Sequence, residues 1–244
     1  MLYFVGLGLK PAHISEEALR AARACDERIL DGYTTPVPED FVKAVEERVG
    51  EVRVAERKEL EEGAVEIVKR AQKKDVALLV WGDPFAATTH VMIRNIAEEE
   101  GVEWKYVPGV SILSVVPSLL GLQHYRFGKV VTIPKTWKDM PSFFEKIERN
   151  RETGAHTLCL VDIGMDMDEA LGALLFWSER RGTELGEIAG IARATWETQI
   201  IRVGTVGELL EEDWGSPPFS IVVPANMHPE EMEAWGAWKR RRKR

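Results

Sequence analysis

A Gly-Asp-Pro sequence at residues 82–84 is the segment of this chain best placed to do chemistry. It lies between an apolar run of strand length and a stretch with helical spacing, so we expect it at the end of a buried strand. Gly82 can adopt positive φ or let a ligand approach the backbone, and Pro84 favours an extended Asp83. Ligands of open α/β sheets bind where strands end, which makes the Asp83 carboxylate a candidate ligand-binding group.

A purely structural interpretation of the same turn stays open. Residues 76–81 form the apolar run, residues 91–100 form the helical pattern, and Thr88 or Thr89 is suited to cap that helix. A turn of this composition joins a strand to a helix whether or not a ligand binds. The motif therefore needs support from the rest of the chain.

Other motifs that carry chemistry are incomplete or absent. Gly6 and Gly8 match the start of a dinucleotide-binding loop, but the third glycine of that loop is replaced by Pro11. Asp31, expected at the end of the second strand, still allows a ribose-binding acid in an oxidoreductase. The sequence has neither a Walker-type phosphate loop nor a Gly-x-Ser-x-Gly turn, so it indicates neither of those enzyme classes.

The five histidines and two cysteines have no spacing typical of a metal site. The sequence contains no His-Glu-x-x-His motif and no Cys/His pair at ligand spacing. Cys25 and Cys159 are far apart, so we expect neither a disulfide framework nor a zinc site. This cysteine usage suits a reducing cytoplasm.

The formal net charge is −8, although residues 239–244 are all lysine or arginine. The rest of the chain is strongly acidic, which argues against a groove for nucleic acid. We expect the basic tail to be a disordered, solubilising terminus. The longest apolar stretch, residues 110–122, contains Pro117 and is too short to cross a bilayer, so we expect a soluble protein.

The order of the apolar runs predicts a two-domain α/β protein. In the first half, runs of strand length alternate with helical patterns, which is typical of a mainly parallel sheet with helices on both faces. The first domain is expected to span residues 1–121. Its strands are expected at residues 2–5, 28–30, 51–54, 76–81 and 104–107.

A second, mixed α/β domain is expected over residues 122–238, followed by the tail at residues 239–244. Thr205 and Glu208 form a Thr-x-x-Glu capping box that opens a short helix. The expected strands are residues 129–133, 157–161, 187–192, 199–204 and 220–223, with helices over residues 142–153 and 167–181.

Several segments together resemble the archaeal diphthine synthases, a family within the tetrapyrrole methylase superfamily. The Gly-Asp-Pro turn is shared across the superfamily, whereas residues 87–90 and 121–128 are more specific to diphthine synthases. The similarity extends over nearly the whole chain. It includes residues 1–9, 33–34, 82–90, 111–112, 121–129, 156–158 and 213–218.

This resemblance implies a homodimeric, two-domain methyltransferase of the cytoplasm that binds S-adenosyl-L-methionine between its domains and needs no metal. The implied acceptor is the histidine of elongation factor 2 that already carries a 3-amino-3-carboxypropyl group. Its amino nitrogen is methylated repeatedly to give diphthine. Neither a membrane nor a nucleic acid is implied as a partner.

The resemblance also carries cofactor contacts onto this sequence, but no catalytic residue. Ala86 and Phe219 stand where the family has a larger aliphatic residue and a histidine, and residues 224–226 lack the usual glycine. Asp31 is a candidate to accept a proton from the acceptor's ammonium group. The implied cofactor-binding residues are Leu9, Asp83, Ala86, Ser111, Ile112, Val161, Ala194 and Phe219.

Two alternatives stay open. A methyltransferase of the same superfamily can act on another acceptor, such as a tetrapyrrole. A diverged, non-catalytic relative that binds the cofactor or elongation factor 2 also fits the altered residues. The segment after Asp162, which is shorter than in the family, is consistent with that second alternative.

Overall fold

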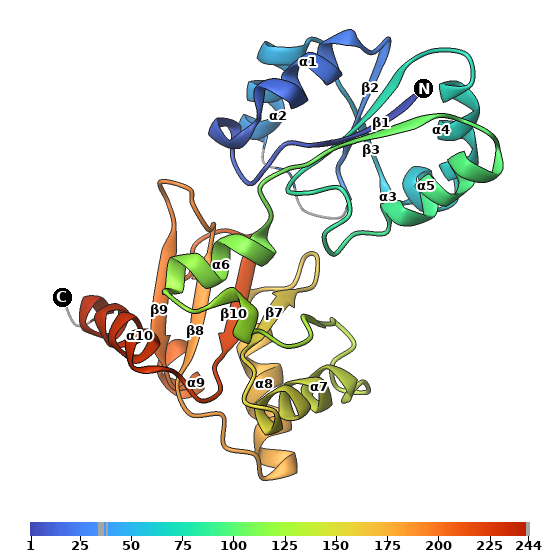
Figure 1. Ribbon diagram of the computed structural model, residues 1–244. Helices are drawn as coiled ribbons and strands as arrows, with labels where there is room; N and C mark the ends of the chain where they lie inside the picture. Colours follow the sequence, from blue (N-terminus) through green and yellow to red (C-terminus); the bar gives the residue numbers. More distant parts are fainter. Residues whose placement is uncertain (34–36, 38, 243–244) are drawn as a thin grey trace. The chain divides into compact units, whose positions relative to one another are not determined.

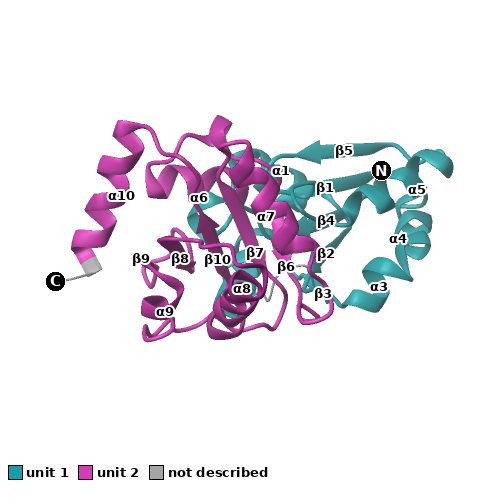
Figure 2. Cartoon of the chain, turned by 90° about the horizontal axis from the view of Figure 1, so that it is seen from below, with its two compact units in different colours: residues 1–112 teal, residues 113–244 magenta. Residues whose placement is uncertain are grey.

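The computed structural model describes residues 1–33, 37 and 39–242. Thr34, which belongs to the family resemblance, and the last two residues of the basic tail lie outside the described residues. The chain divides into two compact units, Met1–Ile112 and Leu113–Arg244 (Figure 2).

The division lies at the start of helix α6 (Ile112–Leu120), earlier than the boundary at residue 121 expected from the sequence. Helix α6 belongs with unit 2 because it is tied to the last helix, α10 (Pro229–Arg242). The indole Nε1 of Trp238 in α10 donates a hydrogen bond of 3.1 Å to the carbonyl of Leu119.

Unit 1 is a five-stranded parallel sheet with helices on both faces, as the alternating pattern predicts. Its strand order is β3-β2-β4-β1-β5, and every neighbouring pair is parallel. Figure 1 shows α1 and α2 on one side of this sheet and α4 and α5 on the other. The strands are β1 Leu2–Gly6, β2 Glu27–Asp31, β3 Arg53–Ala55, β4 Val76–Val80 and β5 Trp104–Val107. The helices are the 3-10 helix η1 Pro11–His13, α1 Glu16–Ala24, α2 Glu39–Val49, α3 Arg57–Glu61, α4 Ala64–Ala71 and α5 His90–Glu99.

The strand order creates a topological switch point between β1 and β4. The chain leaves β1 through α1 towards β2 on one side, and it leaves β4 through α5 towards β5 on the other side. Ligands of open α/β sheets bind outside the carboxyl ends of two such strands, where the loops diverge. The Gly-Leu-Gly segment follows β1 and the Gly-Asp-Pro turn follows β4, so both lie at this position.

Unit 2 contains a mixed five-stranded sheet of order β6-β7-β10-β8-β9. The β6–β7 pair is parallel, whereas β10 is antiparallel to both β7 and β8, and β8 is antiparallel to β9. The strands are β6 Val131–Ile133, β7 Thr157–Val161, β8 Ile188–Ala192, β9 Ile200–Gly204 and β10 Phe219–Val223. The helices, besides α6 and α10, are the 3-10 helix η2 His124–Arg126, α7 Ser142–Glu152, α8 Met167–Arg181 and α9 Val206–Leu209.

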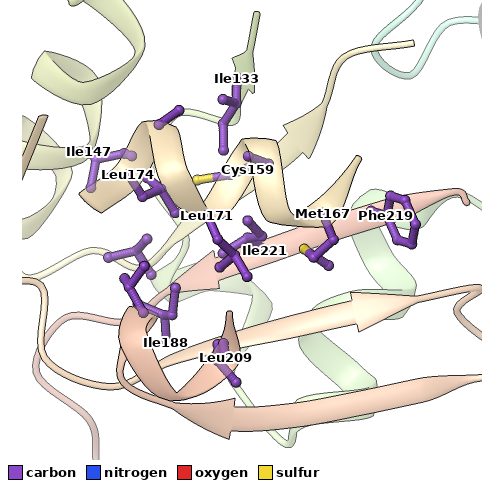
Figure 3. Close-up of a cluster of buried hydrophobic side chains, with 14 of the residues drawn as sticks. Ile133, Ile147, Cys159, Met167, Leu171, Leu174, Ile188, Leu209, Phe219 and Ile221 are labelled. Carbon is purple, nitrogen blue, oxygen red and sulfur yellow. The ribbon is translucent and has the colours of Figure 1, made fainter. Parts of the chain in front are cut away.

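The core of unit 2 forms where α7, α8 and α9 pack against the sheet. Figure 3 shows side chains of α8, such as Leu171 and Leu174, beside strand residues such as Cys159 and Ile221. Phe219 lies at one margin of the labelled cluster and is 7% exposed. The end of β10 that carries Phe219 is therefore anchored in the hydrophobic core.

Side-chain caps open two of the helices. The Ser15 hydroxyl accepts a hydrogen bond of 3.0 Å from the Ala18 amide at the start of α1. Thr205 and Glu208 form both hydrogen bonds of a capping box at the start of α9, as predicted. These caps satisfy backbone donors that the helices themselves leave unpaired.

A buried polar cluster fastens the start of α10 to the rest of unit 2. Glu231 is 0% exposed, and its carboxylate accepts hydrogen bonds of 2.9 Å from the amides of Gln123 and His228. Arg126 Nη1 lies 2.9 Å from the same carboxylate, and buried His156 Nε2 lies 3.3 Å from it. The cluster therefore holds the family-specific segment around Gln123 and Arg126 against the last helix.

The basic tail differs from its predicted disorder, because α10 continues through Arg242. The guanidinium of Arg241 lies over the Trp238 ring, 4.4 Å from its centroid. Lys239 forms a salt bridge with Glu187. Long basic side chains pack in this way when an aromatic ring or an acid is near, which the charge pattern alone does not reveal.

Three further findings bear on the class of protein. No helix in the described ranges is long and apolar enough to cross a membrane. Cys25 and Cys159 are buried and unbridged. Among the same residues, no group of three or more His, Cys, Asp or Glu side chains is placed to hold a metal ion.

Candidate active site

Glycines bring the ends of β1, β4 and β5 together in unit 1. Gly8 and Gly82 both have positive φ and exchange two backbone hydrogen bonds, of 3.1 and 3.0 Å. A Cβ on Gly109 would lie 2.0 Å from the Gly82 carbonyl oxygen, and a Cβ on Gly6 would lie 2.4 Å from the Gly109 nitrogen. Because no side chain fits at these contacts, only glycine lets the three backbones approach so closely.

Asp83 joins the turn after β4 to the end of β5. Its Oδ1 accepts a hydrogen bond of 3.0 Å from the Phe85 amide, within the turn. Its Oδ2 accepts hydrogen bonds from the Gly109 amide, at 3.1 Å, and from the Tyr106 hydroxyl, at 2.5 Å. The carboxylate therefore locks the shape of the candidate site, a role that its position in the sequence does not reveal.

The surroundings of Tyr106 disfavour its ionised form. Burial, together with the hydrogen bond to Asp83 and the negative charge of that carboxylate, raises the pKa of Tyr106 to about 12. The phenol is therefore protonated at neutral pH and available to donate to Asp83. Its ring also packs against Phe85, with 5.2 Å between ring centroids.

A buried contact between Asp31 and His90 supports the turn from β2. Asp31 Oδ2 lies 3.2 Å from His90 Nε2, and both side chains are fully buried. His90 Nδ1 lies 3.0 Å from the Pro84 carbonyl oxygen, and Asp31 Oδ1 accepts a hydrogen bond of 2.8 Å from the Tyr33 amide. The carboxylate is thus buried against His90, where it helps to position the turn, and its candidate role as a proton acceptor stays a prediction.

The turn itself is strained and held by side-chain hydrogen bonds. Thr89 occupies the N-cap position of α5, but its side chain makes no capping hydrogen bond. Thr88 Oγ1 instead accepts from the His90 amide, at 3.4 Å, and donates to the Pro84 carbonyl. Ala87 has a φ of 61°, a conformation that non-glycine residues rarely adopt and that occurs preferentially at functional sites.

Five of the predicted cofactor contacts gather at this edge of unit 1, and all five are half-buried. Leu9 directly follows the Gly8–Gly82 bridge. Its side chain lies close to Gly82, because a Cβ added to that glycine would be 3.9 Å from Leu9 Cδ2. Asp83 and Ala86 belong to the turn after β4. Ser111 and Ile112 follow the end of β5. The fold therefore brings together residues from three separate segments.

The other three predicted contacts gather at one end of the sheet of unit 2. Val161 is the last residue of β7, Ala194 follows the end of β8, and Phe219 opens β10. Phe219 pairs with Ala192, the last residue of β8, and β10 runs antiparallel to both neighbours. The start of β10 therefore lies between the ends of β7 and β8.

The loop after β8 is a second strained segment. Arg193 and Thr195, on either side of buried Ala194, have φ values of 49° and 74°. The Arg193 amide donates to the Pro218 carbonyl at 2.9 Å, and the Thr195 amide donates to Gln199 Oε1 at 2.6 Å. These bonds hold the loop in a conformation that costs on the order of 1–3 kcal/mol per residue.

The family model of the tetrapyrrole (corrin/porphyrin) methylases matches residues 1–210. The chain belongs to the tetrapyrrole methylase family. Its sequence resemblance to that family is therefore confirmed, and the Gly-Asp-Pro turn lies within the matched region.

Among tetrapyrrole methylases, the chain is similar to diphthine synthases. Diphthine synthase of Methanothermobacter thermautotrophicus is 40% identical over 93% of this chain and 91% of its own length. Diphthine methyl ester synthase of Mus musculus is 36% identical over 96% of this chain and 94% of its own. A crystal structure of diphthine synthase matches with a TM-score of 0.89 and 34% identity, over 97% of this chain and 95% of its own. The chain is therefore a methyltransferase of the diphthine synthase type, with the corresponding α/β fold.

Replacing the buried acid, Asp31→Asn, is expected to lower the free energy of unfolding by about 1–3 kcal/mol, because a buried amide is a weaker partner than the carboxylate for the polar groups around it. Denaturant unfolding followed by circular dichroism measures the change. Asp40→Asn, at an exposed position of unit 1, is the matched control and should change the value by no more than about 0.5 kcal/mol. Equally small effects of both substitutions would show that the buried pair does not support the turn.

The Tyr106–Asp83 hydrogen bond is open to a titration experiment. After a rapid pH jump, phenolate absorbance is expected to show Tyr106 ionising near pH 12. Asp83→Asn should move this ionisation towards about pH 10, because the amide removes the negative charge beside the phenol. Tyr106→Phe identifies the signal among the four tyrosines. An unchanged titration in Asp83→Asn would contradict the contact.

Proposed function

We propose that this chain transfers methyl groups from S-adenosyl-L-methionine to the amino nitrogen of 3-amino-3-carboxypropyl-histidine in elongation factor 2, giving diphthine. The observation that carries the proposal is the rigid turn at Asp83, at the topological switch point of unit 1, in a chain of the diphthine synthase type. Ligands of open α/β sheets bind at this position.

The donor supplies an electrophilic methyl group, so the task of the protein is mainly to hold the reactants in line. The amino nitrogen attacks as the neutral amine, so the ammonium form of the acceptor must first lose its proton, which solvent can take up. Alignment can contribute about 7–11 kcal/mol to catalysis. This requirement agrees with a site in which Asp31 and Asp83 are both engaged in internal hydrogen bonds.

The proposed donor contacts are Leu9, Asp83, Ala86, Ser111 and Ile112 in unit 1, and Val161, Ala194 and Phe219 in unit 2. Most of them are apolar or small, and the close approach of the glycine backbones leaves main-chain groups near the ligand position. Ala86 and Ala194 also leave room for a nitrogen that gains several methyl groups. Phe219, which is buried in the core, supplies an apolar wall rather than a polar contact.

The names of the relatives raise a second candidate product. The archaeal relative is called a diphthine synthase, whereas the mouse relative is called a diphthine methyl ester synthase. The two names differ by an ester methyl group, which is carried by a carboxylate oxygen rather than by nitrogen.

Family similarity also supports a homodimer that works in the cytoplasm, with neither a membrane nor a nucleic acid as partner. The acidic composition of the chain outside its basic C-terminal residues agrees with a protein substrate rather than a nucleic acid. Elongation factor 2 is accordingly the proposed partner.

The test is to incubate the purified chain with isotope-labelled S-adenosyl-L-methionine and elongation factor 2 that carries 3-amino-3-carboxypropyl-histidine. Mass spectrometry then counts the added methyl groups. Diphthine formation predicts three that survive mild base, whereas a fourth, base-labile group establishes the ester product. Unmodified elongation factor 2 is the control and should gain no label.

Two other results would overturn the proposed acceptor. Label found instead on a tetrapyrrole, offered in a parallel reaction, would establish the alternative methyltransferase. Calorimetric binding of S-adenosyl-L-methionine without transfer to either acceptor would indicate a non-catalytic relative.

A further inference from the structure

We infer that Arg193 binds the carboxylate of an α-amino-acid group in the ligand, and this inference rests on the proposed function. Arg193 directly follows β8, at the same end of the unit 2 sheet as Val161 and Phe219. Its amide donates to the Pro218 carbonyl at 2.9 Å, which places it beside the residue that precedes Phe219. No cofactor contact was expected at Arg193 from the sequence.

Contacts hold the guanidinium of Arg193 in place, but they use only some of its hydrogen-bond donors. It lies over the Trp196 ring, 4.4 Å from the centroid, and Nη1 lies 3.3 Å from the Ser216 hydroxyl. Its Nε is buried and has no hydrogen-bond partner among the described residues. No Asp or Glu carboxylate of a described residue lies within 4.0 Å of the Arg193 guanidinium nitrogens. Buried donors in native proteins are normally paired, so the described residues leave part of the hydrogen-bonding capacity of this guanidinium unused.

The geometry of the guanidinium donors indicates which class of ligand Arg193 can bind. A guanidinium carries five N–H donors in a fixed plane, and Nε–H and Nη2–H point in the same direction along one edge. Two such donors match the two oxygens of a carboxylate in a bidentate pair. Because Nη1 is engaged with Ser216, a carboxylate would pair with Nε and Nη2, and it would have to displace the groups that cover Nε in this structure.

Two ligands of the proposed reaction carry the required group. S-Adenosyl-L-methionine ends in an α-amino carboxylate, and so does the 3-amino-3-carboxypropyl side chain of the acceptor. In the second case, Arg193 would also hold the acceptor carboxylate away from the donor methyl group. That position favours methylation of nitrogen over formation of a methyl ester.

The experiment compares ligands and variants by calorimetry and steady-state kinetics. Arg193→Gln removes the charge and the two parallel N–H donors, whereas Arg193→Lys keeps only the charge. Arg180→Gln is the matched control. The guanidinium carbon of Arg180 lies 5.8 Å from the ring centroid of Phe176 and 5.6 Å from that of Trp177. Arg180 is near the end of α8, away from the sheet end that carries Arg193. Decarboxylated S-adenosylmethionine, which lacks the carboxylate, is the probe for the donor.

If Arg193 binds the donor, Arg193→Gln weakens S-adenosyl-L-methionine binding by about tenfold to a hundredfold. The decarboxylated probe then binds wild type as weakly as the variant binds the intact donor. If Arg193 binds the acceptor, donor affinity is unchanged, the KM for modified elongation factor 2 rises by a similar factor, and base-labile methyl ester increases. Arg193→Lys should recover only part of either effect, and Arg180→Gln should show neither.

Wild-type levels of donor affinity, acceptor KM and ester content in Arg193→Gln would overturn the inference while leaving the proposed function intact. If Arg193→Gln does not fold, equal binding of the intact and decarboxylated donors by wild type excludes the donor role. Unchanged acceptor KM and ester content in Arg193→Lys would then exclude the acceptor role. Failure of wild type to bind the donor or to transfer methyl groups would overturn the proposed function itself, and this inference with it.

Discussion

The shape of the candidate site depends on the Asp83 carboxylate. It accepts hydrogen bonds from its own turn and from the end of β5, while the neighbouring Gly82 is bridged to Gly8 at the end of β1. Three strands that are far apart in sequence are thereby joined at their carboxyl ends. Because each contact is made within the protein, the turn is organised before any ligand binds, which reduces the conformational entropy lost on binding.

Unit 2 has the corresponding features at one end of its own sheet. The ends of β7 and β8 flank the start of β10, and the loop after β8 is strained at Arg193 and Thr195. In unit 1 the strained residue is Ala87, in the turn that Asp83 locks. Strain of this kind persists only where surrounding contacts enforce it, and in both units those contacts are hydrogen bonds around predicted ligand-binding residues. Loops fixed in this way, in either unit, suit methyl transfer, in which the alignment of two reactants matters more than acid or base catalysis.

Periodicity and turn chemistry were enough to predict much of the fold from the sequence. The expected bounds of β5, β7 and α8 agree with the structure, and the Gly-Asp-Pro turn does follow a buried strand. The pairing of Asp31 with His90, and of Asp83 with Tyr106, was not predicted. Both pairs depend on the strand order, which local patterns do not specify. The helical tail was missed for a related reason, because its packing on Trp238 is a tertiary contact.

Hydrogen exchange with and without S-adenosyl-L-methionine is the first measurement to make, because it reports where on each unit the proposed donor is felt. If the proposed function is right, the donor should add protection at residues 6–9, 82–87 and 109–112 in unit 1 and at residues 193–196 in unit 2. The opposite end of the unit 2 sheet carries a hollow of about 880 Å³, lined in part by Leu185, Pro224 and Trp235. Protection confined to that hollow, or absent from the loops around Gly82 and Asp83, would contradict the account.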